Sequence, residues 1–182
     1  IKNMKKLTKT LFIISTLFGL GACSSTNLPK LQTVERVDLD RYQGEWHEIA
    51  RIDHWFQEGC INSTANYSMR DDGDIRVLNQ CDVENSDGET DEAIGRAWVV
   101  DQESNAKLKV QFPLKGIKLP FLAGDYWIIA LEENYQYAMV GDPKREYLWI
   151  LARNEVLPQS DLDNLLKQAK DAGFPIEQLI YK

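Results

Sequence analysis

The chain has 182 residues, 43% of them hydrophobic, which is the size and apolar content of one domain with its own core. Acidic residues outnumber basic ones by 28 to 21, and the formal net charge is −7. This balance argues against nucleic acid as a partner and against a polybasic surface for anionic lipid, but a ligand inside a neutral cavity stays open.

The first 22 residues indicate an export signal. Four lysines precede the apolar run Leu11–Leu20, which is shorter than the roughly 20 residues that a membrane-spanning helix needs. The run ends in Leu20-Gly21-Ala22-Cys23, which resembles a bacterial lipobox. We therefore expect a lipoprotein signal peptide at 1–22, an acylated Cys23 with a tether through 36, and a folded domain at 37–182. The alternative is an ordinary signal peptide with a chance cysteine.

Acylation would decide where the protein resides. Several acyl chains on Cys23 give firm membrane anchoring, because each buried methylene contributes about 0.8 kcal/mol. Ser24 stands where an aspartate would resemble an inner-membrane retention signal. We therefore expect the outer membrane of a Gram-negative bacterium, with the folded domain on the periplasmic side. Removal of the signal leaves 17 basic and 28 acidic residues, a net charge of −11.

Two cysteines remain after Cys23, and an even pair in an exported protein predicts a disulfide between Cys60 and Cys81. Strict alternation along paired strands does not bring them face to face, so the disulfide needs a bulge near Cys60. The sequence has no Cys-x-x-Cys, and His47 and His54 have no thiol neighbours at metal spacing. We expect no metal and no cofactor, and both histidines on the surface.

Alternating apolar residues and turn signals predict eight strands. They are Tyr42–Ile52, Ile61–Arg70, Ile75–Val83, Ala93–Val100, Lys107–Phe112, Asp125–Glu132, Tyr135–Val140 and Tyr147–Arg153. Most are joined by short turns, and a meander of this kind has two exposed edges unless it closes. We expect an all-β fold, an eight-stranded antiparallel up-and-down barrel whose interior holds one small ligand.

The pattern changes near the C-terminus. Ser160–Gly173 has leucines and an alanine at helical spacing, with Ser160 as the expected N-cap and Gly173 just past the C-terminal end. One apolar stripe predicts a helix that packs on the outside of the barrel. A short strand, Gln178–Tyr181, is expected to follow.

Four blocks of sequence carry a family resemblance. Gly44–Arg51, Gly124–Val140 and Tyr147–Arg153 match the three signature blocks of the lipocalins in order. Thr64–Gly73 matches their bacterial outer-membrane group, which is close to apolipoprotein D and the plant temperature-induced lipocalins. On these residues the chain resembles a bacterial outer-membrane lipocalin. The resemblance implies that three residues close one end of the barrel: Trp46 as a plug, Arg153 across its ring, and Gly44 where the chain crosses beneath.

The resemblance also implies a ligand cavity. By the resemblance, Tyr67, Asn79, Phe112 and Leu131 point into it as candidate ligand-binding residues. If Arg153 faces inward, alternation along its strand adds Leu151 and Trp149 to these candidates. Alternation from Trp46 and along the other strands adds further inward positions: Glu48, Ala50, Ile52, Val77, Val110 and Ile129. A buried Glu48 is expected to be a hydrogen-bonded structural carboxylate.

A cavity of this kind implies a binding protein, not an enzyme. The expected ligands are fatty acids, lysophospholipids or similar amphiphiles, held for transport, storage or scavenging in the cell envelope. One alternative is a lipid-modifying enzyme acting through a free Cys81, and another is a filled barrel that contacts other proteins. The sequence leaves open the identity of the lipid and whether two barrels pair through their rims as a homodimer.

Overall fold

The computed structural model describes residues 28–113 and 123–182. The expected signal peptide, Cys23 and the first part of the tether lie outside the described residues. The helical segments are α1 (Leu39–Tyr42), η1 (Trp55–Gln57), α2 (Gln159–Asp171) and η3 (Ile176–Gln178). The strands are β1 (Gly44–Ile52), β2 (Cys60–Met69), β3 (Ile75–Val83), β4 (Thr90–Val99), β5 (Lys107–Gln111), β6 (Gly124–Leu131), β7 (Tyr137–Gly141), β8 (Leu148–Ala152) and β9 (Leu179–Tyr181). Across the described ranges, no helix is long and apolar enough to cross a membrane.

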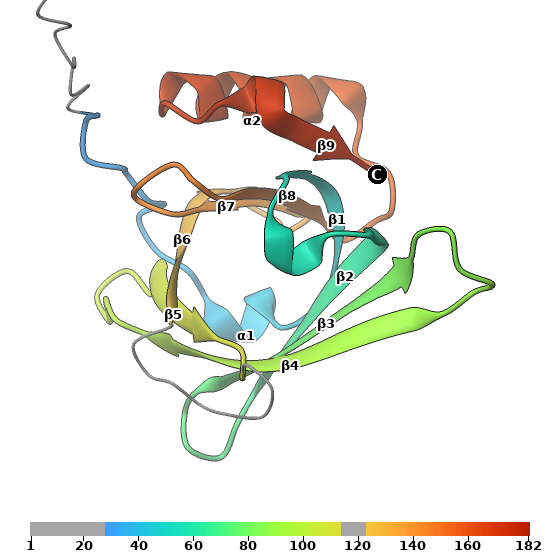
Figure 1. Ribbon diagram of the computed structural model, residues 1–182. Coiled ribbons are helices and arrows are strands. Elements are labelled where there is room, and N and C mark those ends of the chain that lie inside the picture. Colours follow the sequence, from blue (N-terminus) through green and yellow to red (C-terminus); the bar gives the residue numbers. More distant parts are fainter. Residues whose placement is uncertain (1–27, 114–122) are drawn as a thin grey trace, which may run out of the picture.

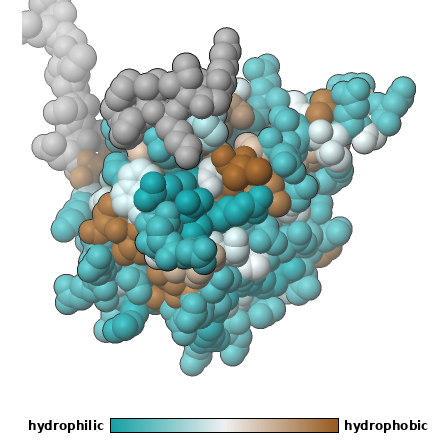
Figure 2. All heavy atoms as spheres, turned by 90° about the horizontal axis from the view of Figure 1, so that it is seen from below, coloured by the Kyte–Doolittle hydropathy of each residue, from teal (hydrophilic) through white to brown (hydrophobic). Residues whose placement is uncertain are grey.

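Strands β1 to β8 form a closed antiparallel up-and-down barrel, which confirms the predicted fold (Figure 1). Each strand pairs with the next in sequence, and β1 closes the ring by pairing with β8. The short β9 pairs with β1 at Ala50–Ile52, beyond the point where β2 pairs with it. Figure 2 shows a face of the molecule that is mostly hydrophilic, with a few separate apolar patches.

Some element boundaries differ from those predicted. Strand β4 begins at Thr90, so the polar residues 90–92 are strand and not loop. Strand β7 begins at Tyr137, because Tyr135 has a φ of 61° and belongs to the turn before it. Helix α2 begins after Pro158, so the predicted N-cap Ser160 is wrong and this residue lies in the first turn.

The molecule has two apolar cores on opposite sides of the barrel wall. One fills the barrel and includes Trp46, Tyr67 and Val77. The other lies between the wall and α2, where Leu165 and Ala169 are fully buried. Helix α2 therefore packs outside the barrel, as its single apolar stripe predicts (Figure 1).

Two β-bulges reverse the predicted inward phase. The β1–β8 register shifts between Glu48 and Ala50, and Ala50 and Ile52 consequently belong to the outer core. The β6–β7 register shifts around Ile129, which also faces the outer core. The inward predictions for these three residues were wrong, because a bulge adds one residue to a period of two.

Candidate functional site

One end of the barrel is closed by Trp46, which is fully buried. Its indole Nε1 donates a hydrogen bond of 2.8 Å to the Tyr42 carbonyl of α1. The guanidinium carbon of Arg153 lies 3.9 Å from the Trp46 ring centroid, a cation–π contact. Gly44 has a φ of 91°, so its left-handed conformation, more than crowding beneath the barrel, explains the glycine.

Arg153 also holds the chain that crosses this end. Its guanidinium donates to the carbonyls of Arg41, Gln43 and Glu45 at 2.8–2.9 Å. These bonds satisfy main-chain oxygens that the turn into β1 would leave without partners. Trp46, Arg153 and Gly44 therefore lie together at this end of the barrel.

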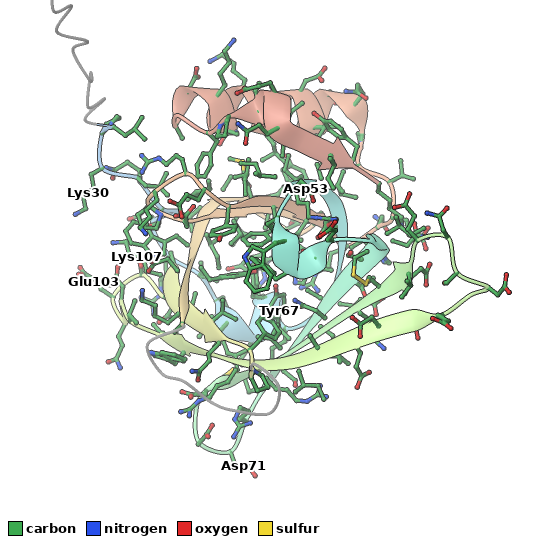
Figure 3. All side chains as sticks on the ribbon, viewed as in Figure 1. Lys30, Asp53, Tyr67, Asp71, Glu103 and Lys107 are labelled. Carbon is green, nitrogen blue, oxygen red and sulfur yellow. A yellow bond between two sulfur atoms is a disulfide. The ribbon has the colours of Figure 1, made fainter. Side chains whose placement is uncertain are left out.

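Above the plug, three tyrosine hydroxyls meet inside the barrel. Tyr126 Oη lies 2.8 Å from Tyr67 Oη and 3.0 Å from Tyr42 Oη; Figure 3 shows Tyr67 projecting into the lumen. Burial raises the pKa of Tyr67 to about 12 and that of Tyr42 and Tyr126 well above the ordinary value, so all three stay neutral. The hydroxyls carry three protons but make two mutual bonds, so they form a polar cluster inside an otherwise apolar part of the barrel.

The pocket between these tyrosines is small. Its walls are otherwise apolar, and include Val77 and Val110, which were predicted to face inward. Its free volume is about 20 Å³, on the order of one water molecule. A ligand larger than water therefore needs space nearer the other end of the barrel, or movement of the side chains.

All six candidate ligand residues face the barrel interior. Tyr67, Phe112, Leu131, Trp149 and Leu151 belong to the inner core. Asn79 pairs with Ala65, another inner-core residue, and its buried Oδ1 has no hydrogen-bond partner.

The six residues do not form one patch. Tyr67, Leu131 and Leu151 lie near the closed end, where β2 and β6 end and β8 runs toward Arg153. Asn79, Phe112 and Trp149 lie nearer the opposite end of the barrel, the mouth, where β1 and β5 end and β8 begins. The Phe112 ring covers Gly95, since a Cβ built at Gly95 would meet it at 2.7 Å.

A charged network ties η1 to the barrel wall near the mouth. Arg51 Nη1 lies 2.5 Å from Glu48 Oε1, and both side chains are buried. Arg51 Nη2 donates to the carbonyls of Gln57 and Cys60. The Gln57 amide donates to Glu48 at 2.8 Å, and its oxygen is 3.4 Å from Trp149 Nε1. Glu48 thus has the hydrogen-bonded structural environment that was expected, while Arg51 was not predicted.

Next to this network, aromatic side chains cover the ring of His54. Its ring stacks on Phe56 with centroids 3.7 Å apart and lies 5.3 Å from Trp149. Burial, with a further contribution from Arg51, lowers the pKa of His54 to about 4. Neither ring nitrogen has a hydrogen-bond partner. The expectation of a surface histidine was wrong for His54, because η1 folds back over it.

Cys60 and Cys81 form the predicted disulfide, with Cα atoms 5.4 Å apart. The β2–β3 register shifts between Ile61 and Thr64, which is the bulge that the pairing required. Cys81 is thereby paired in this structure and offers no free thiol. Among the described residues, no cluster of three or more His, Cys, Asp or Glu side chains could hold a metal ion.

Comparisons with known proteins agree with this architecture. The chain belongs to the lipocalin-like domain family, whose model matches residues 37–182. It is 37% identical over 175 residues to outer membrane lipoprotein Blc of Vibrio cholerae serotype O1, covering 95% of this chain and 97% of that protein. It is also 37% identical to apolipoprotein D of Macaca fascicularis, over 81% of this chain and 75% of that one.

The solved structures give the same fold. Insecticyanin from the tobacco hornworm Manduca sexta superposes with a TM-score of 0.67 at 21% identity, covering 85% of this chain and 84% of the other.

A plant protein is a further relative by sequence. The temperature-induced lipocalin-1 of Arabidopsis thaliana is 34% identical over 85% of this chain and 83% of its own length. The predicted resemblance to bacterial, plant and apolipoprotein D lipocalins is confirmed.

Proposed function

We propose that this protein is a lipid-anchored lipocalin that binds fatty acids, lysophospholipids or similar amphiphiles, for their transport, storage or scavenging in the cell envelope. Lipocalins bind small hydrophobic ligands, and three bacterial relatives carry the name outer membrane lipoprotein. The observation that carries the proposal is the barrel interior, which has an apolar wall and, toward the mouth, the buried polar groups of Arg51 and Asn79. This gradient matches an acyl chain with a polar head.

The proposed chain position follows from the free volume. The pocket beside the tyrosines holds about 20 Å³, whereas ligand cavities generally reach about 300 Å³ or more. In the proposal the acyl chain lies between Asn79, Phe112 and Trp149, and the Phe112 ring moves off Gly95 to deepen the site. Tyr67, Leu131 and Leu151 contact the far end of the longest chains.

In the proposal the head group lies near the mouth. Arg51 Nε and Asn79 Oδ1 are buried without hydrogen-bond partners. An unpartnered buried polar atom costs on the order of 1–3 kcal/mol, and a ligand that supplies the partner recovers it. Both a carboxylate and a phosphate can accept from Arg51 Nε, so fatty acids and lysophospholipids remain in one ligand class.

A titration tests the proposal. Protein beginning at Ser24, delipidated and refolded under oxidising conditions, is titrated with oleate and with lysophosphatidylethanolamine while tryptophan fluorescence is followed. We expect saturable one-to-one binding with a Kd on the order of micromolar. Trp149→Ala should weaken binding about tenfold. The matched control, Trp98→Ala, changes a tryptophan on the outer wall and should bind as the wild type does.

One second candidate has an observation in its favour. The small free volume favours a filled barrel that acts by contacting other proteins. Absence of binding for both lipids would favour that candidate and contradict the lipid-carrier proposal. The enzymatic alternative requires a thiol at Cys81, so a thiol count on the unreduced, denatured protein should give none if the disulfide is intact.

A further inference from the structure

The N-terminal segment enters the fold at the mouth of the barrel. Arg145, in the turn between β7 and β8, donates to the Pro29 carbonyl at 2.6 Å. Further along, Val34 N bonds to Ile128 O, and Val37 N bonds to Ser104 O in the turn between β4 and β5. The segment therefore runs along the barrel from the mouth end to the closed end, and its first described residues lie beside the mouth.

The same rim carries two exposed aromatic side chains. Trp55 is 74% exposed and Phe56 is 51% exposed, both in η1. Phe56 contacts Tyr147 of the β7–β8 turn with ring centroids 5.6 Å apart. The entry of the N-terminal segment and the aromatic rim thus share one turn. Tryptophan and phenylalanine at such positions suit a membrane interface.

The distance from Cys23 to this rim is short. Four residues separate Cys23 from Leu28, and an extended chain of that length spans at most about 18 Å. The nine residues of β1 extend about 30 Å along the wall. A chain anchored at Cys23 therefore holds the mouth close to the bilayer and leaves the closed end far from it.

We infer that the mouth faces the membrane, with Trp55 and Phe56 inserted among the head groups of a phospholipid bilayer, so that the ligand passes directly between bilayer and barrel. This inference rests on the proposed acylation of Cys23. The domain still lies on the periplasmic side, but its opening points back toward the membrane. The acidic turn between β3 and β4, residues 84–89, extends to the side of the barrel in Figure 1. In this inference, apolar side chains drive insertion into the bilayer, and charge does not.

Depth-dependent quenching tests this orientation. The full-length acylated protein is reconstituted in phosphatidylcholine liposomes with and without brominated acyl chains, which quench tryptophans that enter the bilayer. We expect Trp55→Phe to remove most of the bromine-dependent loss of fluorescence. Trp98→Phe, the matched control on the outer wall of β4, should retain that loss. Because the surface is acidic, adding phosphatidylglycerol should not increase the quenching.

Flotation of the same liposomes distinguishes a wrong orientation of the barrel from a missing membrane anchor. Protein that floats, with quenching that depends on Trp55, supports the inference. Protein that floats with equal quenching in wild type and Trp55→Phe overturns the orientation but leaves the anchor and lipid binding standing. Protein that does not float overturns the anchor and the inference together, while the oleate titration still reports on lipid binding. A fourth result is that neither bromine nor aqueous iodide quenches Trp55 and the protein has the mass of a dimer. That result would mean that a second copy covers the rim, and it would overturn the inference.

Discussion

The two ends of the barrel differ in how their buried polar atoms are satisfied. At the closed end, Trp46 Nε1 and the Arg153 guanidinium donate to main-chain carbonyls of the segment that crosses the barrel. At the mouth, Arg51 Nε and both ring nitrogens of His54 are buried without partners. A buried polar atom that has a hydrogen-bond partner stabilises the arrangement in which the bond forms. A buried polar atom without a partner loses nothing when the side chains rearrange, and a ligand can supply the missing bond. The closed end is the structural part of the barrel, and the mouth is the adaptable part.

The largest expected effect is at the plug. Trp46→Ala removes a fully buried indole and the surface on which Arg153 lies. We expect the free energy of unfolding to fall by about 3–5 kcal/mol. Trp55→Ala at the mouth should lower it by less than about 0.5 kcal/mol, since Trp55 is mostly exposed. Urea unfolding followed by circular dichroism measures both, and similar losses in the two variants would contradict the comparison.

A smaller loss is expected when the charged network near the mouth is broken. Arg51→Leu leaves the buried Glu48 carboxylate without its cationic partner. We expect a loss of about 3 kcal/mol at pH 7, because an unpaired buried charge is costly. The double variant Glu48→Gln/Arg51→Leu should regain part of that loss in the same urea measurement. A double variant that is less stable than Arg51→Leu alone would show that the charge is not the cause.

The smallest effect should appear only on acidification. His54 has a folded-state pKa of about 4 against an ordinary 6.5, so between these values the unfolded chain binds a proton that the folded chain does not. Stability is therefore unaffected by His54 above pH 6.5 and is lost as the pH falls toward 4, by on the order of 2–3 kcal/mol.

Substitution isolates this contribution from the carboxylates that also titrate at low pH. His54→Phe keeps an aromatic ring against Phe56 and should reduce the loss of stability between pH 7 and pH 5. His47→Gln, which changes the other histidine of the chain, should retain the wild-type loss. If His54→Phe follows the wild-type curve, the buried ring is not the source of the pH dependence.

The sequence predicts the barrel well because alternation and turn residues are local signals. All eight strands and the outer helix were found, and the inward phase of Tyr67, Phe112 and Trp149 agrees with the inner core. Prediction failed at the bulges, where Ala50 and Ile129 face outward. A bulge is selected by how strands pair across the sheet, which one strand's sequence does not specify.

The same limit explains which site residues were missed. Strict alternation from Trp46 predicts that the Arg51 side chain faces outward. The register shift between Glu48 and Ala50 makes it face inward, where it forms the ion pair with Glu48. A signal was present, because an inward Glu48 needs a cationic partner and Arg51 is the nearest in sequence. The burial of His54 depends on η1 folding over it, and nothing in the sequence of the loop specifies that.

The pairing of β9 with β1 has a consequence for how the chain folds. Residues 179–181 bond to Ala50, Arg51 and Ile52, so the end of β1 is completed by a strand that follows it by more than 120 residues. Contacts this distant in sequence form slowly, on the order of milliseconds to seconds. Until β9 forms, the Ala50–Ile52 end of β1 therefore has a free hydrogen-bonding edge, which is a site for aggregation.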